Sequence, residues 1–148
     1  MDTPSTIFNW PALVVGSAAL LLCLLMQGST VVLVMTKFKP RIRVLAKGRR
    51  SFTAHVLFLG SILILLMSHL AQIYIWALFL YAPDIMSNIH RAVLFAGSTY
   101  TTVGFSNDNL PLQWQLLAVI MATTGLFAFA WSTSIMYALS QQLYPSED

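Results

Sequence analysis

Three long apolar segments dominate the pattern of hydrophobic and polar positions along this chain. The first runs from Trp10 to Thr36 without a charged residue, and the second covers about Ser51 to Tyr81. The third runs from about Pro111 to Leu143. Because a helix rises by about 1.5 Å per residue, each segment is long enough to cross a hydrocarbon core of about 30 Å. The pattern therefore predicts an all-α membrane protein with three transmembrane helices.

A shorter pattern lies between the second and third apolar segments. Ser87 or Asn88 can cap a short helix that runs to about Thr99 or Tyr100. Such a helix is too short to span the membrane, so it would enter from one side. Irregular backbone is expected to follow at 101–107, and such backbone is tolerated at membrane depth only when it is buried in protein or lines water. We therefore expect a re-entrant pore helix and loop.

Basic residues concentrate between the first two predicted spans. Seven of the eight Lys and Arg residues lie in one stretch: Lys37, Lys39, Arg41, Arg43, Lys47, Arg49 and Arg50. The positive-inside rule predicts that this stretch is a cytoplasmic loop, with the N-terminus outside and the C-terminus in the cytoplasm. The net charge of +3 is then explained without a nucleic-acid partner. Membrane lipids are the expected contact, because the loop lies close to anionic head groups.

Composition and the few polar residues inside the spans refine this picture. The chain is 57% hydrophobic and only 9% charged, whereas a soluble domain is roughly a quarter charged. The lone Cys23 is expected to be a buried, inert thiol. Gln27 should face protein, and His69 should be neutral and hydrogen-bonded to the pore helix or a neighbouring span. No nucleophile–base pair or carboxylate pair is placed for catalysis, so we expect no enzyme and no organic cofactor.

The predicted loop carries a dense run of hydroxyl groups with one glycine, Ser98-Thr99-Tyr100-Thr101-Thr102-Val103-Gly104-Phe105-Ser106-Asn107. As a re-entrant loop it would align four backbone carbonyls and one hydroxyl. The carbonyls are those of Thr102, Val103, Gly104 and Phe105, and the hydroxyl is that of Thr102. Four copies around an axis would stack rings of oxygens that can replace the water around a cation.

The pattern Thr-Xaa-Thr-Thr-Val-Gly-Phe resembles the selectivity filter of tetrameric potassium channels, usually Thr-Val-Gly-Tyr-Gly-Asp. The likeness extends into the last span, where Gly125-Leu126-Phe127-Ala128-Phe129-Ala130-Trp131-Ser132-Thr133 is similar to a stretch in small bacterial ion-channel or two-pore-domain-like proteins. Residues 51–148 then resemble the minimal pore module of outer helix, pore helix, filter and inner helix. Residues 1–50 would add an N-terminal transmembrane helix and the basic cytoplasmic loop.

This resemblance implies a homotetramer in a bacterial inner membrane that passes potassium down its gradient. The transported potassium ion would bind at Thr102, Val103, Gly104 and Phe105, with the filter mouth at Ser106, Asn107 and Asp108. Gly125 falls where the inner helix of the family usually has its hinge, or it is a small residue that lets the pore helix pack closely. Leu126, Phe129, Thr133 and Tyr137 recur at helical spacing and would line the cavity, unless they form helix–helix core.

Two alternatives stay open at this point. The family carries a second glycine where this chain has Ser106, and a non-glycine residue in a left-handed backbone conformation costs roughly 1–2 kcal/mol. The pore would then be a weakly selective monovalent cation channel. In the other alternative the protein is a non-conducting channel homologue that acts as a membrane interaction subunit. The long first span, with small residues at Gly16, Ser17, Ala18 and Ala19, favours that interpretation.

Overall fold

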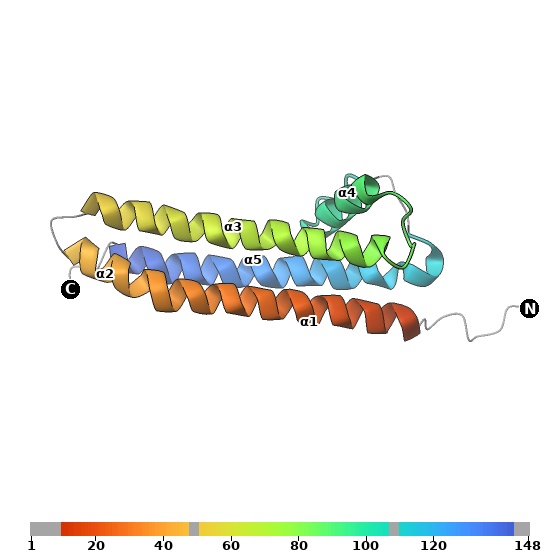
Figure 1. Ribbon diagram of the computed structural model, residues 1–148, viewed down its shortest axis with the longest axis horizontal. Helices are drawn as coiled ribbons and strands as arrows, with labels where there is room; N and C mark the ends of the chain where they lie inside the picture. The colour runs from red at the N-terminus through yellow and green to blue at the C-terminus, as the bar shows by residue number, and fades with distance from the viewer. Residues whose placement is uncertain (1–9, 48–50, 107–109, 144–148) are drawn as a thin grey trace, which may run out of the picture. The chain divides into compact units, whose positions relative to one another are not determined.

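The computed structural model of the chain describes residues 10–47, 51–106 and 110–143. These residues form helices joined by turns, with no strand among them. The long helices are α1 (Trp10–Leu33), α3 (Ser51–Tyr81) and α5 (Leu116–Leu143) (Figure 1). Three helical stretches, Trp10–Ala46, Phe52–Tyr81 and Leu112–Leu143, are long and apolar enough to cross a membrane. The predicted all-α fold with three spanning helices is confirmed, and the chain is a multi-pass membrane protein.

The basic segment after the first span differs from its prediction. A π-helix, η2 (Val34–Phe38), continues α1 and leads into α2 (Lys39–Lys47). The predicted loop was therefore wrong for residues 37–47, which are helical, while residues 48–50 lie outside the described part of the chain. Pro40 lies inside this continuous helical stretch, directly after η2, where the Lys39 N–H donates to the Val34 carbonyl in the wider π-helical pattern.

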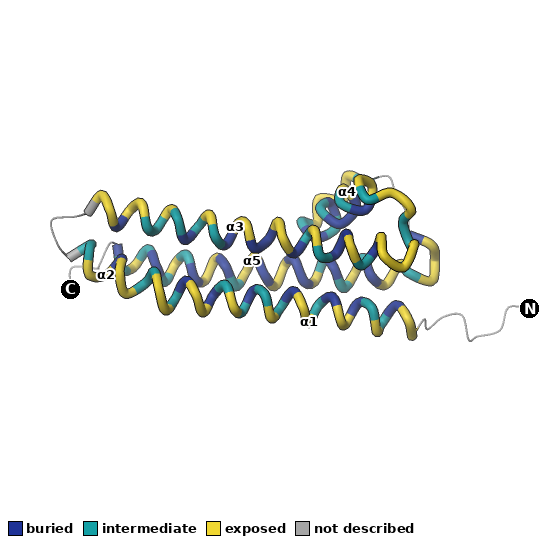
Figure 2. The backbone as a smooth tube through the Cα atoms, viewed as in Figure 1, coloured by how far each residue is buried: buried dark blue, intermediate teal, exposed yellow. Residues whose placement is uncertain are grey.

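The chain divides into two compact units, which are described separately. Unit 1 comprises Met1–Leu25 and Leu70–Phe127, and unit 2 comprises Met26–His69 and Ala128–Asp148. The predicted division of the sequence near residue 50 is a different partition and stays a prediction. Along each long helix, buried positions alternate with exposed ones (Figure 2). Many of the exposed side chains are large and apolar, as expected for helices whose outer faces meet lipid.

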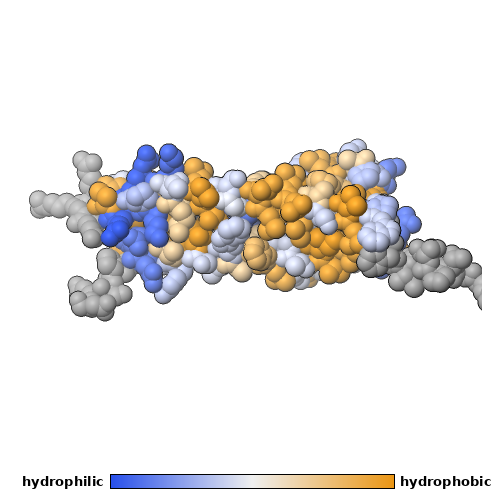
Figure 3. Space-filling view, turned by 90° about the horizontal axis from the view of Figure 1, so that it is seen from below, coloured by the Kyte–Doolittle hydropathy of each residue, from blue (hydrophilic) through white to orange (hydrophobic). Residues whose placement is uncertain are grey.

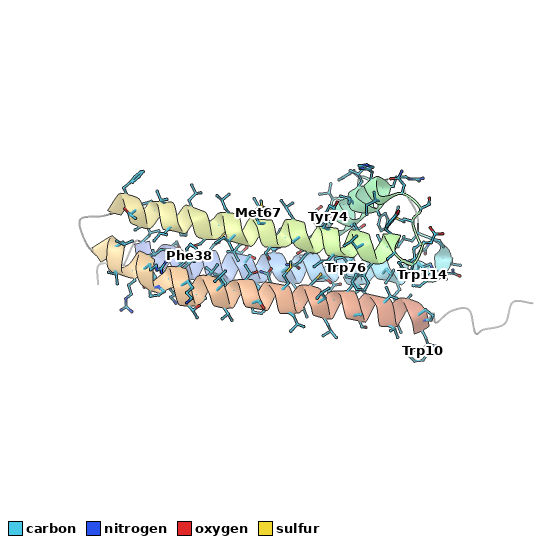
Figure 4. All side chains as sticks on the ribbon, in the orientation of Figure 1. Trp10, Phe38, Met67, Tyr74, Trp76 and Trp114 are labelled. Carbon is cyan, nitrogen blue, oxygen red and sulfur yellow. The ribbon has the colours of Figure 1, made fainter. Side chains whose placement is uncertain are left out.

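In unit 1, aromatic side chains mark the start of α1 and the turn before α5. Trp10 is 69% exposed, and Trp114 belongs to the short 3-10 helix η3 (Leu112–Trp114). Both lie at the same end of this unit (Figure 4), and tryptophan is enriched where a span meets the membrane–water interface. Inside the unit, Gly16 allows close packing, because a Cβ atom there would lie 2.6 Å from Cδ1 of Ile120. The first and third spans therefore pack closely in this unit.

In unit 2, an apolar cluster joins the inner faces of all its helices. Its buried members are Val31, Val34, Ile42, Ala54, Leu65, Ile135, Leu139 and Leu143. They come from α1, η2, α2, α3 and α5, so the basic segment is attached to the spans by Val34 and Ile42.

A buried hydrogen-bonded network of polar side chains also lies in unit 2. Gln27 donates from Nε2 to Oγ of Ser132 at 2.9 Å, and Ser68 donates to Oε1 of Gln27 at 2.9 Å. The His69 Nε2 and Ser132 Oγ atoms lie 3.0 Å apart. All four side chains are buried. The structure thus confirms that Gln27 faces protein and that His69 hydrogen-bonds a neighbouring span, and Cys23 is buried as predicted.

We expect Gln27→Leu to destabilise the folded protein by about 1–3 kcal/mol, because it removes the buried hydrogen bonds of Gln27 to Ser68 and Ser132. Thermal unfolding in detergent measures the effect. Thr36→Val is the matched control, since Thr36 is exposed and donates only to backbone carbonyls of its own helix. Equal stability of the two variants would show that the network contributes nothing to folding.

Candidate functional site

The short helix α4 (Ile89–Tyr100) has the predicted cap and the predicted end. Oδ1 of Asn88 accepts from the backbone N–H of His90 at 2.8 Å and of Arg91 at 3.3 Å. The helix has 12 residues, and at about 1.5 Å per residue it is too short to cross a bilayer. Its C-terminal end carries the partly negative charge of the helix dipole. Of the residues predicted for the two ends, Asn88 is the N-cap and Tyr100 is the last helical residue.

Tyr100 fastens the C-terminal end of α4 inside unit 1. Its side chain is fully buried, and its hydroxyl donates to Oε1 of Gln72 on α3 at 3.0 Å. Burial, with a smaller contribution from Cys23, raises the pKa of this hydroxyl above its ordinary value. The hydroxyl therefore stays protonated at neutral pH and remains a hydrogen-bond donor.

Gly125 receives the backbone of Tyr100 on the other side. A Cβ atom at position 125 would overlap the carbonyl oxygen of Tyr100 and would lie 2.8 Å from its carbonyl carbon. The last turn of α4 therefore lies directly on the backbone of α5. Of the two roles considered for Gly125, this contact is the close packing of the short helix, while a hinge at this position stays a prediction.

The residues after α4 turn back onto its last carbonyls. The Thr102 N–H donates to the Thr99 carbonyl at 3.0 Å, and the Gly104 N–H donates to the Ser98 carbonyl at 3.1 Å. The Thr102 hydroxyl donates to the preceding carbonyl, that of Thr101, at 2.7 Å. These bonds satisfy the free carbonyls of the helix end and hold the loop beside it.

The carbonyl groups of the loop itself have no hydrogen-bond donor among the described residues. Those of Thr102, Val103, Gly104 and Phe105 accept no hydrogen bond from any residue that the structure describes. The same four residues are exposed, with Val103 at 67% and Phe105 at 60%. Because these four residues are exposed, their carbonyls are open to water or to an ion, and exposed apolar side chains stand beside them.

Two residues of this run have positive φ angles. Thr102 has a φ of 60° and Gly104 a φ of 70°, whereas Ser106 does not have a positive φ. A Cβ atom at Gly104 would meet nothing within 4 Å, so the glycine is required there by backbone conformation and not by space.

The other predicted site residues divide into described and undescribed ones. Asn107 and Asp108 lie outside the described residues. The face of α5 that was expected to line a cavity is exposed at Leu126 (58%), Phe129 (37%) and Tyr137 (65%).

The hydroxyl of Thr133 is exposed as well, and it donates to the Phe129 carbonyl at 2.9 Å. This face is thus no core of the described chain, although the Phe129 ring touches that of His69 at 4.4 Å between centroids. The sequence analysis left open whether this face packs against other helices, and within one chain it largely does not.

Sequence reasoning missed the hydrogen-bonded pair of Gln72 and Tyr100, which supports the end of α4 before the loop. Gln72 is a polar residue in the middle of an apolar helix, and that anomaly was the available signal. The spacing to Tyr100 gives no indication that the two side chains meet, because their contact depends on how α4 packs against α3.

No family model, no curated protein and no solved structure matches this chain.

We expect Gly125→Ala to destabilise unit 1 by about 1–3 kcal/mol or more, because the added methyl group overlaps the Tyr100 carbonyl. Alanine is otherwise the better helix former by about 1 kcal/mol. Gly97→Ala is the matched control: its Cβ atom would meet Cγ2 of Ile73 at an ordinary 3.8 Å. Thermal unfolding should separate the two variants, with Gly97→Ala neutral or stabilised. A stable Gly125→Ala protein would contradict the close packing of the two backbones.

Proposed function

We propose that this protein is a homotetrameric cation channel of a bacterial inner membrane, passing potassium passively through a filter of backbone carbonyls. The observation that carries the proposal is the run of four exposed carbonyls, at Thr102, Val103, Gly104 and Phe105, that accept no hydrogen bond from the described residues. Four copies of this run around one axis would present rings of oxygens to a dehydrated ion.

The loop carbonyls need a binding partner if the loop lies at membrane depth, and a cation can be that partner. A backbone carbonyl without a partner is costly in an apolar medium, so at membrane depth it needs water, protein or a cation. In one chain the loop is open on its outer side. Symmetry-related copies would cover Val103 and Phe105 and leave the carbonyls facing a shared axis.

The electrostatics of α4 support the same assignment. The helix ends directly before the loop, so its partly negative end lies next to the proposed ion path. Backbone oxygens and hydroxyl groups, with no net charge, are the ligands that suit a weakly hydrated monovalent cation. The exposed face of α5 at Leu126, Phe129, Thr133 and Tyr137 would line the water-filled part of the pore.

A weakly selective cation pore is the second candidate, and one observation favours it. The positive φ angles fall at Thr102 and Gly104, and Ser106 stands where the family has a second glycine. A filter with one flexible glycine in place of two would hold its outermost oxygen ring differently. Ser106→Gly should then raise the ratio of potassium to sodium flux.

The first experiment measures ion flux through the purified protein in liposomes. We expect potassium to pass faster than sodium, with no flux in protein-free liposomes. Native mass spectrometry of the same preparation should give four copies. Absence of potassium flux, together with a stoichiometry other than four, would favour the non-conducting membrane subunit.

The decisive variant is Gly104→Ala, which we expect to abolish conduction while the tetramer survives. Its methyl group has space, but the φ of 70° costs a non-glycine residue about 1–2 kcal/mol, so the carbonyls would rotate away. Gly60→Ala on α3 is the control: its Cβ atom would contact only the Phe38 ring, at 4.0 Å, and its flux should be unchanged. Normal potassium flux through Gly104→Ala would refute the filter assignment.

A further inference from the structure

A cavity of about 650 Å³ lies in unit 2, beside the basic helix α2 and the C-terminal end of α5. We call it the basic cavity. Its lining residues are Met35, Lys39, Pro40, Arg43, Val44 and Gln142. Its volume falls in the range of roughly 300–1,000 Å³ that is usual for small-molecule sites. None of these residues takes part in the proposed ion path.

Two cations, Lys39 and Arg43, line the basic cavity. Lys39 and Arg43 are four residues apart on α2, so their side chains leave the same face of the helix. Like charges at this spacing repel each other. The part of the chain that the structure describes forms no ion pair with either residue, and Asp84 in unit 1 is its one carboxylate side chain. The other acidic residues lie outside the described ranges.

Apart from Gln142, the rest of the cavity lining is apolar. Met35, Pro40 and Val44 supply hydrocarbon surface, and Val44 is 71% exposed. A smaller groove of about 390 Å³ shares Pro40 and Val44 and is also lined by Arg41 and Leu45. Hydrophilic residues gather at the α2 end of unit 2, with hydrophobic surface directly beside them (Figure 3). A ligand with an anionic head and an apolar tail fits both parts of this surface.

We propose that the basic cavity binds an anionic phospholipid, with the phosphate group held by Lys39, Arg43 and Gln142. The Arg43 guanidinium can donate two parallel hydrogen bonds to phosphate oxygens, Lys39 adds a point charge, and the Gln142 amide donates a further hydrogen bond. An acyl chain would lie along Met35 and Val44. The helical segment that forms the cavity is continuous with the first span, so the cavity would lie close to the lipid head groups.

The expected consequence is a bridge between two elements of unit 2. The cations come from α2, whereas Gln142 comes from the last turn of α5. A bound head group would hold these two ends together. The proposal does not depend on conduction, because it concerns lipid binding alone and its test measures no ion flux.

The test titrates the purified full-length protein in neutral detergent with phosphatidylglycerol, and in parallel with phosphatidylcholine and with soluble glycerol phosphate. We expect saturable binding of phosphatidylglycerol, at least about tenfold tighter than that of phosphatidylcholine. Glycerol phosphate should not compete at the same concentrations, because it lacks the acyl chains. Equal competition by glycerol phosphate would overturn the assignment to a lipid.

Matched variants separate a built cavity from diffuse attraction to positive charge. Lys39→Gln with Arg43→Gln should weaken phosphatidylglycerol binding by about tenfold more than Lys37→Gln with Arg49→Gln, which removes the same charge from the basic stretch 37–50. Equal losses in the two double variants would overturn the proposal.

Gln142→Leu tests the contribution of α5 without changing the charge. It should weaken binding several-fold, whereas Gln141→Leu, beside the cavity in sequence but absent from its lining, should not. Circular dichroism confirms that each variant is folded. Unchanged binding in Gln142→Leu would refute the bridge between α2 and α5.

Discussion

The contact between the Tyr100 backbone and Gly125 is the constraint on which the candidate site depends. It brings the carbonyl end of α4 onto the backbone of α5, with no space for a side-chain carbon between them. The Tyr100 hydroxyl adds a bond to Gln72 on α3. The residue before the loop is thus held by two helices at once. Because the loop begins at the next residue, its carbonyls start from a fixed point even though the loop itself is exposed.

The two units treat polar groups in opposite ways. In unit 2, three hydrogen bonds join four buried polar side chains, those of Gln27, Ser68, His69 and Ser132. In unit 1, the loop leaves four consecutive carbonyls without a partner among the described residues.

The buried polar side chains of the described residues are hydrogen-bonded, whereas the four loop carbonyls belong to exposed residues. A buried indole N–H at Trp76 is the only side-chain exception among the described residues.

Much of the fold was accessible from the sequence because the membrane simplifies the problem. Apolar length predicts a span, and Asn88 before a short amphipathic stretch predicts a capped helix. The helical course of residues 37–47 was missed because charge and Pro40 suggested a loop, whereas the helix continues through the proline by way of the π-helix η2. The role of Gly125 could be narrowed to two alternatives but not decided, since a packing distance between helices is not encoded in either sequence segment alone.

The backbone angles place the conformational cost of the loop at Thr102 and not at Ser106. The sequence analysis located that cost at Ser106, because the resembling family has glycine there. In the structure Ser106 has no positive φ, whereas Thr102 does. A threonine in the left-handed region costs about 1–2 kcal/mol and persists only where neighbouring contacts impose it.

Those contacts are present at Thr102. Its N–H bonds the Thr99 carbonyl, and its hydroxyl bonds the Thr101 carbonyl. Both bonds are local, so the conformation follows from the end of α4 and not from a partner chain. The geometry of the innermost carbonyls is therefore imposed by the same helix end that Tyr100 and Gly125 hold in place. The carbonyls of Gly104 and Phe105 have no such support, so their arrangement depends on what surrounds the loop.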